Sequence, residues 1–180
     1  MSTESTSRAA HGHTQLLHAQ ALIDHSKSVV FVKGCDGRHL VVNQAFRHAL
    51  AHVESDPLGK TDDALFSPDE AARLRHHDEI VLKGGDSIEF EEEVDFGTTV
   101  RTYATVKFPI LDDSGTIVGS GGVATDITDY KDQAVTVLID GKIVVLDHNP
   151  ESHTRARAEH QASVQTAMTA LARAALTGAG

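Results

Sequence analysis

The apolar residues of this chain follow two periodicities, which separate helical from extended segments. Residues 13–26 carry apolar positions at helical spacing and predict an amphipathic helix, whereas residues 1–12 are small, polar and aperiodic and are expected to be disordered. The β-branched runs SVVFVKG and HLVVN then flank Asp36-Gly37, a strong turn signal. This pattern predicts a β-hairpin.

Two helices are expected after this hairpin, each with a recognisable first residue. Asn43 is placed to cap NQAFRHALAH, whose apolar residues fall on one side. Ser67 begins Ser-Pro-Asp-Glu, which combines an N-cap, a proline at the first helical position and a capping box. We expect the second helix to reach about Lys83, because Gly84-Gly85 follows.

Three further extended runs, SIEFEEEV, TTVRTYATVKFPIL and TIVGSGGVATDIT, are separated by turn-rich segments and predict an antiparallel meander. Two strands, short helices and three strands form an α+β arrangement with helices packed on one face of the sheet. In SIEFEEEV we expect Ile88, Phe90 and Val94 to point inward. The acidic residues Glu89, Glu91, Glu92 and Glu93 are expected on a solvated face.

The chain continues beyond this unit. AVTVLIDGKIVVLD, within residues 132–149, contains Asp140-Gly141 between β-branched runs and predicts a second hairpin, which either extends the sheet or pairs with another subunit. Residues 150–180 predict a helix with Val164, Met168 and Leu171 near heptad spacing, over too few repeats for a stable isolated coiled coil.

Composition limits the function classes. With 180 residues, 40% of them apolar, the chain can bury one core with extensions. The formal net charge of -10 opposes nucleic acids and anionic membranes, and no apolar run is long enough to cross a bilayer. Cys35 is the single cysteine, which excludes an intramolecular disulfide and fits a cytoplasmic location.

The order of these segments over residues 22–131 resembles a PAS domain. The resemblance is carried by VVFVKGCDGRHLVVNQAF, DPLGKTDDALFSPDEAARL and VKFPILDDSGTIVGSGGVATDITDYK. It implies a PAS domain over residues 27–131, with a five-stranded antiparallel sheet and helices enclosing a small pocket. It also implies that Asp126, Ile127 and Thr128 form the exit through which a signal leaves the domain.

The layout of the family suggests which bulky residues line such a pocket. The alternative is that the same residues simply fill the core, because the chain is poor in aromatic residues. The candidates are Phe31, Phe46, Phe66, Leu74, Val81, Phe90, Tyr103 and Val123.

The same resemblance suggests which cofactors to consider. Haem-binding members place a histidine on the long helix, where His77 is the candidate. We expect His76, His77, Asp78 and Glu79 to form a solvated polar run rather than a metal site. Flavin photochemistry is not expected, because Cys35 lies in a hairpin turn rather than in the helical segment of flavin-binding relatives. Neither G-x-S-x-G nor a phosphate-binding loop occurs, so the chain is not expected to be an enzyme.

We therefore expect a non-catalytic PAS sensory and dimerisation module. Its expected partners are a second copy of itself, a downstream signalling domain and a small apolar ligand. The end of the chain resembles a helix that leads into an output or GAF domain, which predicts a fragment of a longer signalling protein. A haem-based gas or redox sensor using His77 and a pure interaction scaffold are the alternatives.

Overall fold

A computed structural model describes residues 17–53, 55–96, 99–131, 134–139, 142–147, 155 and 157–169. The predicted disorder of residues 1–12 lies outside this part of the chain. The first residues of the predicted helix 13–26 and the last residues of the predicted helix 150–180 also lie outside it. Of those two helices, residues 17–24 and 157–169 are described, and both stretches are helical.

A five-stranded antiparallel sheet forms the centre of the molecule. Its strands are β1 (Val29–Gly34), β2 (His39–Val42), β3 (Ile88–Asp95), β4 (Val100–Leu111) and β5 (Ile117–Asp126). They lie in the order β2-β1-β5-β4-β3, so the first and last strands of the unit are neighbours at the centre. The predicted hairpin and meander are both confirmed.

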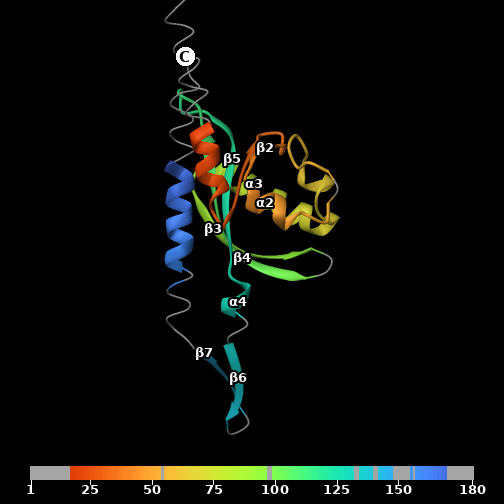
Figure 1. The fold of residues 1–180 in the computed structure, drawn as a ribbon, viewed down its shortest axis with the longest axis vertical. Coiled ribbons are helices and arrows are strands. Elements are labelled where there is room, and N and C mark those ends of the chain that lie inside the picture. The colour runs from red at the N-terminus through yellow and green to blue at the C-terminus, as the bar shows by residue number, and fades with distance from the viewer. Residues whose placement is uncertain are drawn as a thin grey trace, which may run out of the picture.

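Three helical elements connect β2 to β3 and lie on one face of the sheet (Figure 1). They are α2 (Gln44–Ala49), the 3-10 turn η1 (Asp62–Ala64) and α3 (Pro68–Gly84). The predicted caps are confirmed: Asn43 accepts a hydrogen bond from the backbone of Phe46, and Ser67 accepts one from Glu70. Gly85 ends α3 with a φ of 74°, a left-handed conformation that favours glycine.

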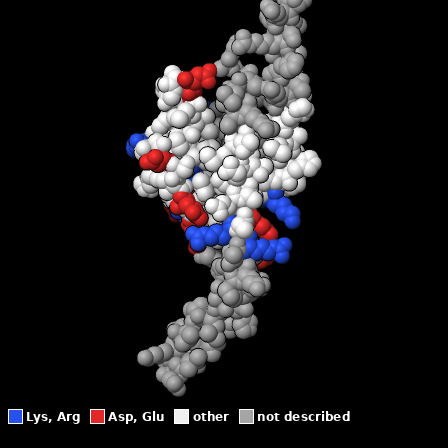
Figure 2. Space-filling model, turned by 90° about the vertical axis from the view of Figure 1, so that its left-hand side faces the viewer, with Lys and Arg blue, Asp and Glu red and all other residues white. Residues whose placement is uncertain are grey.

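The opposite face of the sheet is covered by the helices of residues 17–24 and 157–169, which flank it in Figure 1. Both contribute to one apolar cluster, and the helices therefore occupy both faces of the sheet rather than one. Figure 2 views the molecule from this side, where most of the described surface is uncharged. The buried members of the cluster are Ile23, Val30, Phe108, Val123 and Ala167.

The glycine cluster of β5 is explained by two aromatic rings. A Cβ on Gly122 would overlap the ring of Phe31 on the face covered by α2 and α3, and a Cβ on Gly121 would overlap the ring of Phe108 on the other face. Each glycine thus makes room for a phenylalanine that packs closely against the central strand. This close packing fixes one aromatic anchor on each side of the sheet.

After β5 come a short helix, α4 (Thr128–Lys131), and the strands β6 (Ala134–Ile139) and β7 (Lys142–Asp147). The last two pair antiparallel, which confirms the predicted second hairpin. They form a two-stranded sheet of their own and do not extend the five-stranded sheet.

Candidate functional site

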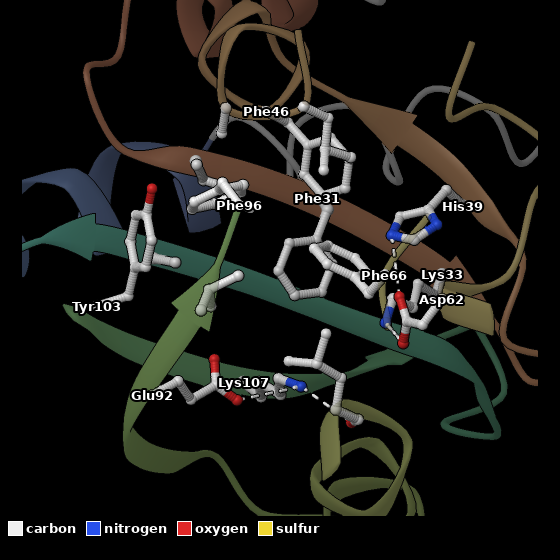
Figure 3. A pocket seen from close by; sticks show the side chains of 16 residues that line it. Phe31, Lys33, His39, Phe46, Asp62, Phe66, Glu92, Phe96, Tyr103 and Lys107 are labelled. Atoms are coloured by element: carbon white, nitrogen blue, oxygen red, sulfur yellow. Dashed lines mark hydrogen bonds and ion pairs between the residues drawn. The ribbon is translucent and has the colours of Figure 1, made fainter. Parts of the chain in front are cut away.

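A small cavity lies between the sheet and the elements α2, η1 and α3 (Figure 3). Its volume is about 60 Å³, and aromatic side chains from β1, α2 and β4 form much of its wall. Five of the predicted pocket residues line it, namely Phe31, Phe46, Phe66, Leu74 and Tyr103. Phe31 and Phe46 meet edge to face, with ring centroids 6.1 Å apart.

The other three predicted residues lie elsewhere. Val123 belongs to the apolar cluster on the opposite face of the sheet, because it alternates with the cavity-lining Ala124. Val81 is fully buried on α3 but does not line the cavity. Phe90 stacks on the ring of His77, with centroids 3.9 Å apart.

One end of the cavity holds charged side chains that the sequence pattern did not single out. The Lys33 ammonium lies 2.5 Å from Oδ2 of Asp62 and 2.8 Å from Oδ2 of Asp78, and this lysine is only 2% exposed. Its Nζ also lies 5.2 Å from the centroid of the Phe31 ring. The aromatic wall and the charged end therefore meet at Phe31.

A second buried lysine, Lys107 on β4, completes this charged cluster. Its Nζ lies 3.0 Å from Oδ1 of Asp78 and 3.7 Å from Oε1 of Glu92, and it donates a hydrogen bond to the carbonyl of Leu74. The expectation that Glu92 is solvated is therefore wrong. Glu92 is two residues from both Phe90 and Val94, so strand alternation puts it on the same face as these apolar residues.

The ion pairs favour the charged forms of Lys33 and Asp78. Burial by itself would lower the pKa of Lys33, but Asp78 and Asp62 outweigh it and the pKa is raised. Burial by itself would raise the pKa of Asp78, but Lys33 and Lys107 hold it below its ordinary value. We will call Lys33, Asp62, Asp78, Glu92 and Lys107 the buried charge cluster.

His39 lies beside this cluster and packs against both Phe31 and Phe46. Its Nδ1 donates to the carbonyl of Lys60 over 2.9 Å, and its Nε2 lies 3.6 Å from Oδ1 of Asp62. Burial and the nearby charge of Lys33 lower the pKa of His39, which keeps its ring neutral at neutral pH.

His77, the candidate haem ligand, lies outside the cavity. Its Nδ1 is hydrogen-bonded to Glu92 over 2.7 Å and its ring stacks on Phe90. A cavity of about 60 Å³ is also far smaller than a haem. The residues present therefore do not fit a haem ligated by His77.

The other proposed sites do not come together either. Asp78 faces the buried lysines, away from any shared metal site with its neighbours on α3, and the described residues contain no group of three or more potential ligands in metal-binding arrangement. Cys35 is exposed, and its Sγ lies 3.7 Å from the carbonyl oxygen of Ile117, outside the cavity.

The predicted exit is built around Thr128. Its hydroxyl donates to Oδ1 of Asp126 over 2.6 Å and accepts from the backbone nitrogen of Thr102 over 2.9 Å. The carbonyl of Thr102 accepts from the backbone of Ile127, so one residue of β4 holds the exit twice. Although burial opposes it, hydrogen bonds from Thr128 and Arg101 keep the pKa of Asp126 below its ordinary value.

Tyr103 connects the cavity to this exit. Its side chain lines the cavity, and in the ladder between β4 and β5 its direct partner is Asp126. Ala124, two residues before Asp126, also lines the cavity. Burial raises the pKa of the Tyr103 hydroxyl to about 12, so it stays protonated. The cavity wall and residues 126–128 are thus joined through one residue pair of the ladder between β4 and β5.

A family model described as the PAS fold matches residues 23–132, which is more than half of the chain. The chain is 32% identical over 120 residues to the methanogenesis regulatory histidine kinase FilI of Methanothrix harundinacea, covering 66% of this chain and 13% of that protein. It is 35% identical over 103 residues to a diguanylate cyclase of Vibrio cholerae, covering 56% of this chain and 32% of the relative. The chain thus spans a third or less of these relatives.

Among solved structures, the complex of Vibrio cholerae VqmA with a ligand and DNA is similar with a TM-score of 0.56 and 19% identity. The similarity covers 79% of this chain and 57% of that one, and at this identity it shows a shared fold. Within the described part of the chain, every helix is too short or too polar to span a bilayer.

Proposed function

Because the chain belongs to the PAS family, whose domain is a sensory module, we propose that it senses a small molecule in the cavity and relays its presence through Asp126, Ile127 and Thr128. One observation carries this proposal. Tyr103 lines the cavity and pairs directly with Asp126, so the binding site and the exit share a strand ladder.

The size of the cavity supplies a physical reason for a response. At about 60 Å³ it is well below the roughly 300 Å³ of the smallest typical ligand pockets, so most ligands can enter only by displacing its wall. Ala124 lies two residues before the exit, and Tyr103 pairs with Asp126, the first exit residue. A displacement of β4 at Tyr103 moves Thr102, whose two backbone groups bind Ile127 and Thr128.

We propose that any catalysis belongs to a downstream signalling domain and that this module is not an enzyme. The titratable groups of the buried charge cluster bind one another, which stabilises fixed charges rather than a reactive group. The two relatives are a histidine kinase and a diguanylate cyclase, and only a part of each matches this chain. The same kind of module is therefore compatible with different outputs.

We also propose that the module forms a homodimer through its terminal helices. Leu17, Leu22 and Met168 are 56%, 48% and 39% exposed, although they lie on the helices that cover one face of the sheet. Apolar side chains that remain exposed on such helices are typical of an association surface. Light scattering after size-exclusion chromatography would show two chains per particle, and Leu22→Glu would shift it to one.

Nucleic acid and membranes remain outside the proposed partners. The net charge of -10 opposes both, and in Figure 2 the basic side chains are interspersed with acidic ones and form no continuous basic surface on that side. The similar structure solved with DNA shares the fold and is a different protein. A cytoplasmic location remains the prediction from the single cysteine and the charge.

The sensory proposal is tested by blocking the cavity. Native mass spectrometry and a thermal-shift screen with a library of small fragments should find binders of the wild type. Ala124→Leu, which fills the cavity wall, should abolish their binding, whereas Ala72→Leu on the exposed side of α3 should leave it unchanged. Equal binding by Ala124→Leu, with its fold verified by circular dichroism, would place the ligands elsewhere and refute the proposal.

A further inference from the structure

The charged end of the cavity presents a carboxylate oxygen that lacks a hydrogen-bond donor. Oδ2 of Asp62 accepts from Lys33, but Oδ1 has no hydrogen-bond partner among the described residues. Asp62 is 5% exposed and lines the cavity, so bulk water does not solvate this oxygen freely. A buried carboxylate oxygen in this state favours the arrival of a donor.

A second acceptor faces the first. The carbonyl of Lys60 can only accept, so Nδ1 of His39 must carry the hydrogen of their 2.9 Å bond. In the neutral ring Nε2 then has a lone pair and no hydrogen, and it lies 3.6 Å from Oδ1 of Asp62. Figure 3 shows the two side chains facing each other at one end of the cavity. Two acceptors in this arrangement repel each other unless a donor lies between or beside them.

The charges of the cluster also favour a donor that carries a positive charge. The buried charge cluster contains two ammonium groups and three carboxylates, and both lysines are shared between carboxylates. His77 binds Glu92, at the far side of the cluster from Asp62, and does not line the cavity. Within the cluster, Lys33 is the one ammonium group paired with Asp62, and it is shared with Asp78, so a further positive charge at the Asp62 end is favourable.

From these observations we propose that the cavity selects small N–H donors, and above all compact cations of the amine or amidine class. This inference rests on the proposed sensory function and names the class of its ligand. The N–H group donates to Oδ1 of Asp62 and Nε2 of His39, and its charge balances the cluster. The apolar part contacts Phe46 and Phe66, whose rings also suit a nearby cation.

The cavity volume limits the ligand. A cavity of about 60 Å³ is smaller than an apolar cavity of about 150 Å³ that holds benzene, so a ligand of few non-hydrogen atoms enters with little rearrangement. Water is the competing occupant, because it also donates hydrogen bonds and the volume accommodates a few molecules. A site that holds only water has no preference for an organic cation, so a measured preference distinguishes the two possibilities.

The test uses three probes with the same number of non-hydrogen atoms: propylamine, acetone and acetate. Titration of the full ¹⁵N-labelled chain with each, followed by amide chemical shifts near Asp62 and Tyr103, gives their relative affinities. We expect propylamine to bind at least about tenfold more tightly than acetone, because it alone supplies a charged donor, and acetate to bind most weakly.

The acceptor is tested by Asp62→Asn, which should reduce the affinity for propylamine at least about tenfold and remove its advantage over acetone. Asp113→Asn, at an exposed turn, is the matched control and should change nothing. The ranking of probes on the wild type tests the inference by itself if Asp62→Asn does not fold.

Each outcome has one meaning. If acetone or acetate binds the cavity as tightly as propylamine, the donor preference is refuted while the sensory proposal stands. If none of the probes perturbs the cavity and the fragment screen also finds no binder, both are refuted. If the preference for propylamine survives Asp62→Asn, it does not arise from this acceptor and the inference fails.

Discussion

The two faces of the central sheet are built from opposite materials. The face under the helices of residues 17–24 and 157–169 is an apolar cluster around Val30, Phe108 and Val123. The face under α2, η1 and α3 contains a cavity and the buried charge cluster, with Lys33 and Lys107 almost fully removed from solvent. The apolar face is suited to stabilising the sheet, and the cavity face is suited to binding a ligand.

The energetics of the two faces support this division. Burying a large apolar side chain contributes roughly 1.5–3 kcal/mol, so the apolar cluster stabilises the fold directly. Buried ion pairs contribute little net stability, because desolvation opposes their attraction, and apolar replacements of whole clusters are often neutral or stabilising. The charges of the cavity face are therefore better explained by recognition than by stability.

The largest expected effect comes from leaving one charge of the cluster without its partner. Lys33→Met strips Asp62 and Asp78 of an ammonium group at 2.5 and 2.8 Å, and should lower the free energy of unfolding by roughly 3–5 kcal/mol. Urea unfolding measures this. Lys83→Met breaks an exposed pair with Glu79 and should change stability by less than about 0.5 kcal/mol.

A loss below about 1 kcal/mol for Lys33→Met would mean that the cluster is open to solvent rather than buried. The contrast between an apolar face and a face with buried charges would then no longer hold.

Gly121 and Gly122 of β5 allow the same substitution to be made on each face of the sheet. Gly122→Ala and Gly121→Ala should both lower stability by roughly 1–3 kcal/mol, because each new methyl group collides with a phenylalanine ring. Only Gly122→Ala moves Phe31, and so only this change should weaken the binding of propylamine to the cavity. Equal binding losses in the two variants, measured by the same titration, would show that the faces are not independent.

Much of the fold follows from local signals in the sequence. Asn43 and Ser67 mark helix starts, Gly85 marks a helix end, and Asp-Gly pairs mark hairpins, because each acts on backbone groups a few residues away. The resemblance implied a five-stranded antiparallel sheet, but the strand order, with β1 beside β5, was not predicted. Pairing between the ends of a unit depends on packing across the whole chain.

Only the aromatic and aliphatic part of the candidate site was predicted from the sequence. The buried charge cluster was missed because a lysine or glutamate in a strand normally faces solvent, and because its partners are distant, with Lys33 and Asp78 separated by 45 residues. Two signals were nevertheless present. Lys33 interrupts the apolar run VVFVKG, and Glu92 is in phase with its inward neighbours Phe90 and Val94.

The smallest expected effect is the pH dependence of stability that arises from two histidines, His39 on the cavity face and His160 on the opposite face. Burial lowers the pKa of His39, with a further contribution from Lys33, and burial lowers that of His160 although Glu89 opposes it. His160 is 5% exposed and its Nδ1 is 2.8 Å from the hydroxyl of Thr125 on β5. Below the ordinary histidine pKa of 6.5 the unfolded chain therefore binds more protons than the folded one.

Stability should accordingly be constant above that pH and fall as the pH drops from 6.5 toward the lowered values of the folded state. Urea unfolding between about pH 7.5 and 5.5 measures the slope. His39→Gln and His160→Gln should each make the slope shallower, one through the cavity face and the other through docking of the last helix. A slope unchanged in both variants would show that neither ring is buried in its neutral form.

The central claim is that the cavity and the exit respond together through Tyr103 and its partner Asp126. The most direct measurement follows the amide signals of Tyr103, Ile127 and Thr128 while the cavity is titrated with the tightest-binding of the three probes. All three signals should shift along one binding curve in the wild type. In Thr128→Val, which removes the hydroxyl bound to Thr102 and Asp126 but keeps the Ile127–Thr102 hydrogen bond, the cavity signals should still shift while the shifts at the exit become smaller. Cavity signals that shift in the wild type without any change at Ile127 and Thr128 would contradict the claim.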